Sequence, residues 1–260
     1  MNAMSRILGY CRTALAAALL CAVSAGAAMA TPSTQIWIPS TDVQAFKTFH
    51  FGFDTYIRAN ANDDGSRTPA IVDLGLTAGV LPFQKIQAEV GFDLIEQADP
   101  FGKSPLYFNA KVGTPEDAWF KGSPAIAVGG YNFGTKSDVT DVNIVYGLVA
   151  RTLPVVGRLS AGYYGLNKDA ALATVFDANG VKGDESGVLL SWDRTLTEIS
   201  DKLWVAVDYQ GGDNAYGALN FAFSWAFAKN VSVIFGYDIY NDKARGGENT
   251  YTVQLDINFP

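Results

Sequence analysis

The sequence predicts an all-β chain that folds as a twelve-stranded antiparallel transmembrane β-barrel, preceded by a cleaved signal peptide. The prediction rests on a C-terminal strand that alternates strictly between polar and apolar residues, on eleven further segments with the same period of two, and on connections that alternate in length. A sheet with one apolar face must cover that face. Closure into a barrel lets lipid cover it and leaves no unpaired strand edge.

Residues 1–30 have the three parts of a secretory signal peptide. Two arginines form a basic start, residues 14–23 form an apolar core, and the Ala-Met-Ala that ends at Ala30 is a small-x-small cleavage pattern. The apolar core is shorter than the roughly 20 residues that a membrane-spanning helix needs. We therefore expect export through the Sec pathway and cleavage after Ala30.

The composition of the exported chain excludes several chemistries. Cys11 and Cys21 lie in the signal segment, so no thiol remains for a disulfide, a nucleophile or a zinc site. His50 is the single histidine, which excludes a multi-histidine metal site. Of the 19 basic residues 17 remain against 26 acidic ones, a net charge of −9 that disfavours nucleic acid as a partner. We expect no cofactor and no metal.

Each predicted strand is a window of about eight to eleven residues that alternates with period two, bounded by clusters of Gly, Asn, Asp or Pro. In chain order the windows are 47–58, 70–80, 86–96, 106–113, 125–133, 142–151, 158–165, 187–194, 203–210, 217–227, 231–240 and 250–259. After a segment at 31–46, the barrel is expected to occupy residues 47–260.

The first four windows each have one apolar phase and one polar phase. Phenylalanines alternate with His50 and Asp54 in the first window, and Val and Leu alternate with Asp73 in the second. In the third, Ile, Val, Phe and Leu alternate with Glu89 and Asp93, and in the fourth, Leu, Phe and Val alternate with Tyr, Asn and Lys. Successive side chains of a strand point to opposite faces, so each window predicts a strand between lipid and water.

The middle windows are less uniform. Residues 125–133 are apolar on both faces, so the sequence leaves their orientation open. Residues 142–151 and 158–165 are joined by a turn that contains Pro154 and Gly157, and 187–194 follows a long polar stretch. These windows predict strands whose inward phase is assigned by the polar residues that they contain.

The last four windows include the strongest signal. Residues 217–227 and 231–240 are separated only by Ala-Lys-Asn, which predicts a hairpin. Residues 250–259 read TYTVQLDINF, and ten residues is the length that a tilted strand needs to cross a bilayer. With Phe259 one position before the chain ends, this strand resembles the closing strand of bacterial outer-membrane β-barrels. The resemblance implies recognition of the C-terminal strand by the barrel-assembly machinery.

The connections test the strand count independently. Short ones lie at 81–85, 152–157, 195–202 and 228–230, and longer polar ones at 59–69, 97–105, 134–141, 167–186, 211–216 and 241–249. Membrane barrels have an even strand number, short periplasmic turns and longer outer loops, so both termini are expected in the periplasm. The long connection 114–124 departs from this pattern, and its Trp119 and Phe120 are expected in an interfacial aromatic girdle.

A soluble β-sandwich is the competing fold, because it also consists of short alternating strands. The export signal, the terminal aromatic strand and aromatic residues near strand ends favour the barrel. Those aromatic residues are Tyr56, Tyr131, Tyr209, Trp225, Tyr237 and Tyr251.

If the apolar phase faces lipid, the opposite phase lines the lumen. Unpaired charges cannot remain in a dry core, so this lining predicts either water or a dense set of ion pairs. Twelve strands fall between the filled barrels of eight and the open porins of 16–18, so the lumen should be narrow. The charged lining residues predicted are His50, Asp54, Arg58, Asp73, Glu89, Asp93, Lys111, Arg151, Arg158, Asp208, Asp238 and Asp256, with Asp193 in the same phase.

These features predict a passive outer-membrane channel for ions or small hydrophilic solutes, with a weak cation preference from the acidic excess. The leading alternative is a non-conducting barrel that serves as a surface scaffold or adhesin. The third is an outer-membrane hydrolase built on His50. Asp54 is the nearest acid in the inward phase of the same strand, but the two positions are about 13 Å apart at the usual rise per residue, too far for a hydrogen bond. We therefore expect no catalytic residue.

Residues 32–42 and 236–242, together with the final strand, resemble a group of uncharacterised Gram-negative outer-membrane proteins. The resemblance implies an outer-membrane location, with lipid and lipopolysaccharide as surroundings, and implies no substrate. Two prolines interrupt residues 31–46, which either enter the periplasmic mouth as a plug or form a free tail, and the free tail is preferred. Acidic loops at 60–65 and 177–185 carry oxygen ligands suited to calcium, although neither completes an EF-hand loop.

Overall fold

The computed structural model describes residues 33–62, 64–96, 104–167, 169 and 180–260. The predicted signal peptide 1–30 and its cleavage site after Ala30 lie outside the described residues. So does part of the acidic loop 177–185.

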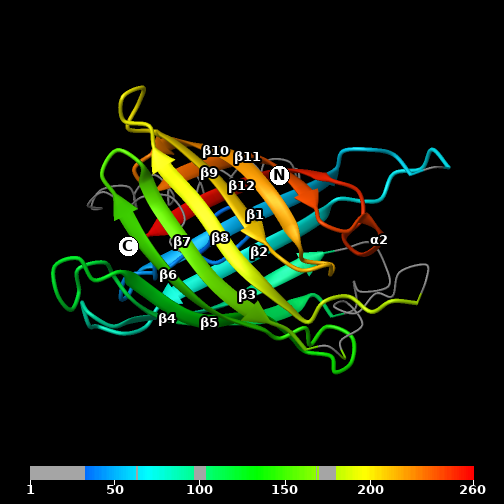
Figure 1. Ribbon diagram of the computed structural model, residues 1–260, viewed down its shortest axis with the longest axis horizontal. Helices are drawn as coiled ribbons and strands as arrows, with labels where there is room; N and C mark the ends of the chain where they lie inside the picture. Colours follow the sequence, from blue (N-terminus) through cyan, green and yellow to red (C-terminus); the bar gives the residue numbers. More distant parts are fainter. Residues whose placement is uncertain (1–32, 63, 97–103, 168, 170–179) are drawn as a thin grey trace, which may run out of the picture.

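In the described part of the chain twelve strands form one antiparallel sheet, in which each strand pairs with its neighbours in sequence and β1 pairs with β12 (Figure 1). The strands are β1 (Phe49–Arg58), β2 (Ile71–Gly79), β3 (Gln87–Glu96), β4 (Leu106–Thr114), β5 (Ala125–Gly134), β6 (Ile144–Leu153), β7 (Gly157–Gly165), β8 (Ser186–Thr195), β9 (Leu203–Gln210), β10 (Ala218–Ala228), β11 (Val231–Tyr240) and β12 (Thr250–Phe259). The predicted strand order and closed barrel are confirmed, and no strand end differs from its window by more than two residues. The two packed sheets of a sandwich are excluded by this closure.

The outside of the barrel is apolar along every strand. On β10 the exposed set is Phe221, Phe223, Trp225 and Phe227, which are 37–62% exposed, whereas Asn220 and Ser224 are buried in the interior. Residues of β5 resolve the ambiguity that the sequence left, because its alanines point inward and its bulky valine and isoleucine point outward. A continuous exposed apolar surface of this kind is what a barrel presents to lipid.

The two ends of the barrel differ in their connections. The end that we name the turn mouth carries the short connections 80–86, 154–156, 196–202 and 229–230 as well as the longer connection 115–124, and it also holds the start of β1 and the end of β12. The opposite end, the loop mouth, carries the longer loops and the short helix α2 (Lys243–Gly246), which Asp242 caps (Figure 1). Among the described residues no helix is both long enough and apolar enough to cross a membrane.

Most of residues 33–44 are buried inside the barrel, and residues 45–46 are exposed at the turn mouth. We name residues 33–40 the inner hairpin. An isolated bridge joins Thr34 to Pro39, and a backbone hydrogen bond of 2.8 Å runs from Gln35 N to Ile38 O. Gln35, Ile38 and Ser40 are fully buried. The preference for a free tail is therefore wrong. The segment closes its own turn, and the polar lumen supplies partners for the backbone groups that remain.

Candidate functional site

The tip of the inner hairpin is bound by a carboxylate on β9. Asp208 Oδ2 accepts hydrogen bonds from the backbone N–H groups of Ile36, Trp37 and Ile38 at 2.8, 2.9 and 3.3 Å. Its other oxygen accepts from Asn220 Nδ2 on β10 at 2.6 Å. Successive N–H groups that converge on one anion form a strong cradle, so Asp208 holds the hairpin tip against β9.

Side chains of other strands hold the rest of the hairpin. Gln254 Nε2 on β12 donates to the Ile36 carbonyl at 2.9 Å, and Gln35 Nε2 donates to Asp193 Oδ1 on β8 at 3.1 Å. Asp193 also accepts from Arg158 Nε on β7 at 2.9 Å and from Trp204 Nε1 on β9 at 3.1 Å. The hairpin is thus joined to strands that span half of the barrel wall.

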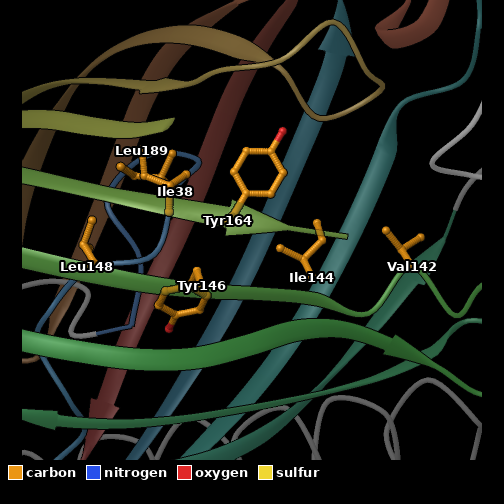
Figure 2. Packing of buried hydrophobic residues seen from close by; sticks show 7 residues of the cluster. All are labelled: Ile38, Val142, Ile144, Tyr146, Leu148, Tyr164 and Leu189. Carbon is orange, nitrogen blue, oxygen red and sulfur yellow. The ribbon is translucent and has the colours of Figure 1, made fainter. Parts of the chain in front are cut away.

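Apolar contacts reinforce this attachment on one side. Ile38 belongs to a buried cluster with Leu148 of β6, Tyr164 of β7 and Leu189 of β8. Figure 2 shows Ile38 beside Leu189 of β8, with Leu148 on β6 beyond the intervening strand β7. Burying an isoleucine side chain contributes roughly 1.5–3 kcal/mol, so this cluster fixes which wall the hairpin contacts.

The chain passes from the inner hairpin to β1 across β2 at the turn mouth. Phe46 forms a parallel bridge with Gly79, and Gln44 N donates to Glu89 Oε2 of β3 at 2.6 Å. A Cβ on Gly79 would lie 1.9 Å from Ala45 O, a distance that no side chain tolerates. Gly79 therefore permits the close approach of the two backbones at this crossing.

A cavity of about 430 Å³ remains between the inner hairpin and the opposite wall. It extends from Thr77 near the turn mouth to Arg58 and Arg245 near the loop mouth. Polar and aromatic side chains of β1–β5 form one side, and Ile36, Trp37 and Pro39 of the hairpin form the other. This cavity is the candidate functional site.

Acidic residues on three adjacent strands line one level of the cavity. Asp54 of β1 stands directly opposite Asp73 of β2 in the antiparallel register, and Asp93 of β3 is paired with Gly75, two positions from Asp73. Asp93 Oδ2 accepts from Asn109 Nδ2 at 2.7 Å. Like charges directly across a strand pair destabilise a sheet, so this arrangement is costly for the fold.

Two other acids of the cavity are paired. Glu89 Oε1 lies 3.1 Å from Lys111 Nζ on the neighbouring strand, and Lys111 also donates to the Ser33 carbonyl at 3.1 Å. His50 Nε2 lies 3.4 Å from Asp256 Oδ1. Both pairs lie closer to the turn mouth than Asp54 does. His50 is nearer than Asp54 to the start of β1, and Glu89 and Lys111 lie near the start of β3 and the end of β4.

Aromatic rings form the level above the acids, toward the loop mouth. The Trp37 ring stands edge-on to Tyr56 at 5.2 Å and to Tyr240 at 5.8 Å, and Trp37 Nε1 donates to the Tyr216 carbonyl at 3.0 Å. The Arg58 guanidinium lies 5.2 Å from the Tyr240 ring. Burial raises the pKa of Tyr216, so its hydroxyl stays protonated at neutral pH.

The structure places most of the predicted lining residues at the cavity. His50, Asp54, Arg58, Asp73, Glu89, Asp93, Lys111 and Asp256 line it. Arg158 and Asp208 instead contact residues 33–46, since Arg158 pairs with Asp42 and Asp208 holds the hairpin tip. Asp238 is fully buried on β11 and accepts from Thr250 Oγ1 at 2.6 Å.

Arg151 does not lie where the sequence predicted. It belongs to the outward phase of β6, and its guanidinium pairs with Glu116 at 3.2 Å and with Asp117 at 2.9 Å in the connection 115–124. A hydrogen bond from the Gly122 amide and another from Arg151 lower the pKa of Asp117. The inward phase of β6 is apolar because it packs on the hairpin, so the rule that polar residues face inward failed for this strand.

Several cavity residues were missed from the sequence. Tyr56 and Tyr131 were assigned to an aromatic girdle, but both line the cavity. A signal for Tyr56 was present, because it shares the inward phase of Asp54. Trp37 could not be found in this way, since no strand periodicity covers the inner hairpin.

The geometry around His50 bears on the hydrolase alternative. His50 Nδ1 lies 3.1 Å from Asn258 Oδ1, and its other ring nitrogen faces Asp256. Asp256 in turn accepts from Ser232 Oγ at 3.3 Å. The imidazole is thus held between two side chains of β12, an arrangement that suits a structural histidine.

The acidic loops give no metal centre in the part that the structure describes. Asp64 Oδ1 accepts from the backbone N and the hydroxyl of Ser66, and these hydrogen bonds lower the pKa of Asp64. Across the described residues no cluster of His, Cys, Asp and Glu side chains could hold a metal ion.

Comparison with known proteins supports the fold. No protein-family model matches the chain, and no curated protein matches its sequence. Among solved structures, the KdgM porin has a TM-score of 0.51 at 11% identity over 82% of this chain and 99% of the porin. An outer membrane channel from Pseudomonas putida F1 has a TM-score of 0.47 at 11% identity over 84% and 96% of the two chains. The NanC porin has a TM-score of 0.45 at 11% identity over 81% and 99%. The likeness to the KdgM porin, together with the closed sheet, shows that this chain has a porin-like barrel fold.

Proposed function

We propose that this protein is an outer-membrane channel for ions or small hydrophilic solutes, exported through the Sec pathway with residues 1–30 as its signal peptide. The observation that carries the proposal is a cavity lined by charged and aromatic side chains inside a closed sheet whose outer surface is apolar. A surface of that kind belongs in lipid, and a hydrated cavity in its interior gives a route for polar solutes.

The inner hairpin narrows this route and determines its course. It is held against β6–β9, so solutes would pass along the cavity beside β1–β4. The acids Asp54, Asp73 and Asp93 on that side favour cations, because carboxylates that line a narrow pore attract positive ions. Weak cation preference is therefore the expected selectivity.

Planar-bilayer recording of the refolded protein tests the channel. We expect discrete current steps and, under a KCl gradient, a reversal potential displaced toward that of potassium. Asp73→Asn should reduce this displacement without abolishing the current, and Asp201→Asn in an exposed turn is the matched control. A membrane that stays silent over a wide voltage range would contradict the channel.

The second candidate is a non-conducting surface scaffold, and the bound hairpin is the observation that favours it. If the hairpin seals the lumen, the native protein is silent and loosening the hairpin creates current. A variant that conducts while the native protein does not would therefore support the scaffold.

The hydrolase alternative has its own test. We expect the purified protein to hydrolyse neither phospholipid nor peptide. If it does hydrolyse one of them, and His50→Ala abolishes that activity, the protein is an enzyme.

We further propose that the C-terminal strand is the element that the barrel-assembly machinery binds and that lipid and lipopolysaccharide surround the barrel. Deletion of residues 250–259 should then prevent assembly in outer membranes.

A further inference from the structure

The level of the cavity that holds Asp54 and Asp73 lies directly below its aromatic level. In the β1–β2 register Asp54 is opposite Asp73, and the next inward pair toward the loop mouth is Tyr56 opposite Ile71. Two residues along a strand correspond to roughly 7 Å. Charge and apolar surface therefore meet within the length of one small molecule.

One oxygen of the Asp73 carboxylate points to a missing ligand. Asp73 Oδ1 is buried and, among the described residues, has no hydrogen-bond donor, although Asp73 lines the cavity. The Lys and Arg side chains along the same cavity are engaged elsewhere. Lys111 binds Glu89, Arg58 donates to the carbonyls of Gly246 and Glu248, and Arg245 pairs with Asp242. A buried carboxylate oxygen without a donor is costly, so the site is incomplete without a hydrogen-bond donor. The two acids that face each other favour a donor with a positive charge.

The aromatic level is held rigidly by the inner hairpin. The backbone N–H of Trp37 donates to Asp208, and its indole N–H donates to Tyr216 O. These two bonds hold the indole edge-on to Tyr56 and Tyr240. Aromatic faces attract cations within about 6 Å and also cover hydrocarbon.

We propose that the cavity binds small organic cations of the alkylammonium class. The ammonium group donates to Asp54 and Asp73, and the alkyl chain lies against Tyr56 and Trp37. An ammonium group supplies N–H donors and also the positive charge that balances the two carboxylates. The cavity volume of about 430 Å³ is within the range of small-molecule sites. This inference rests on the proposed function, because it names the class of solute that such a channel would select.

Calorimetric titration of the refolded protein in detergent tests the proposal without any measurement of conduction. The probe is n-butylammonium chloride, compared with n-butanol, sodium butyrate and ammonium chloride. We expect saturable binding of n-butylammonium and weaker binding of each comparison compound. Equal binding of n-butanol would overturn the role of the acids, and equal binding of ammonium would overturn the role of the rings.

Variants assign the binding to this site. Asp73→Asn should weaken n-butylammonium binding roughly tenfold, as expected when a charged hydrogen bond is lost. Tyr56→Leu should weaken it roughly threefold through loss of the ring face. Asp201→Asn is the control with the same charge change. Unchanged binding in Asp73→Asn would overturn the proposal, and if that variant fails to refold, Asp54→Asn carries the same test.

The result separates this inference from the channel. Binding by a protein that passes no current would support the cation site and contradict the channel. Current without any binding of n-butylammonium would support the channel and overturn the cation site.

Discussion

The lumen of this barrel has two walls that are built from similar residues and behave differently. On the docked wall, formed by β6–β9, buried acids receive donors from the hairpin and from neighbouring strands, as Asp208 and Asp193 do. On the hollow wall, formed by β1–β4, Asp54 faces Asp73, and one oxygen of Asp73 has no hydrogen-bond donor in the described part of the chain. Residues 33–46 therefore supply donors to the acids of the docked wall and to Glu89 of the hollow wall, and they leave the level of Asp54 and Asp73 incomplete, which is where a ligand site can exist.

Asp208→Ala should have the largest effect on this contrast. It leaves the N–H groups of Ile36, Trp37 and Ile38 without their acceptor, so we expect stability to fall by roughly 3 kcal/mol and the hairpin to leave the docked wall. Hydrogen exchange at these amides measures the release, and urea unfolding in lipid vesicles measures the stability. Ala replacement of the exposed Asp201 is the control. If the amides remain protected, Asp208 does not hold the hairpin.

Gly79→Val should displace the backbone that joins the inner hairpin to β1, where this backbone crosses β2. A Cβ at this position would lie 1.9 Å from Ala45 O and 2.4 Å from Gln44 O, so the backbone has to move. We expect a loss of roughly 1–3 kcal/mol in the same unfolding assay. Gly147→Val is the matched control, because nothing lies within 4 Å of a Cβ built there. Equal stability of the two variants would show that the crossing at Gly79 is not constrained.

Gly52→Met should change the hollow wall and spare the docked wall. Gly52 lines the cavity, and the nearest atom to a Cβ built there is His50 Nε2 at 3.7 Å, so a longer side chain extends into empty space. We expect single-channel conductance to be roughly halved, since the route narrows, with unfolding little affected. Gly147→Met adds the same side chain outside the barrel and should leave conductance at its native value.

The smallest expected changes in stability come from replacing one acid on each wall by asparagine. Asp54→Asn removes a like charge opposite Asp73, so stability should rise by roughly 0.5 kcal/mol. Asp193→Asn weakens bonds from Arg158, Trp204 and Gln35, so stability should fall by about 1 kcal/mol. Urea midpoints of the two variants provide the comparison. A loss of stability in both would mean that the hollow wall also depends on its acids for folding.

Residue alternation alone was enough to predict the strands, their order and most of their phases, because a strand between lipid and a polar interior imposes a period of two that is visible in any window of about ten residues. It also predicted the charged residues that now line the cavity, since these follow from the same alternation. The phase of β6 was the exception, because that strand packs on apolar hairpin residues and presents Ile144 and Leu148 inward.

The contents of the lumen, in contrast, depend on contacts between residues far apart in the sequence. The bond between Ile36 and Asp208 joins residues 172 positions apart, and the bond between Gln254 and Ile36 joins residues 218 positions apart. No local pattern encodes such pairings, because they depend on which walls meet when the sheet closes. The position of the hairpin, and with it the cavity beside Asp54 and Asp73, is therefore a property of the closed barrel.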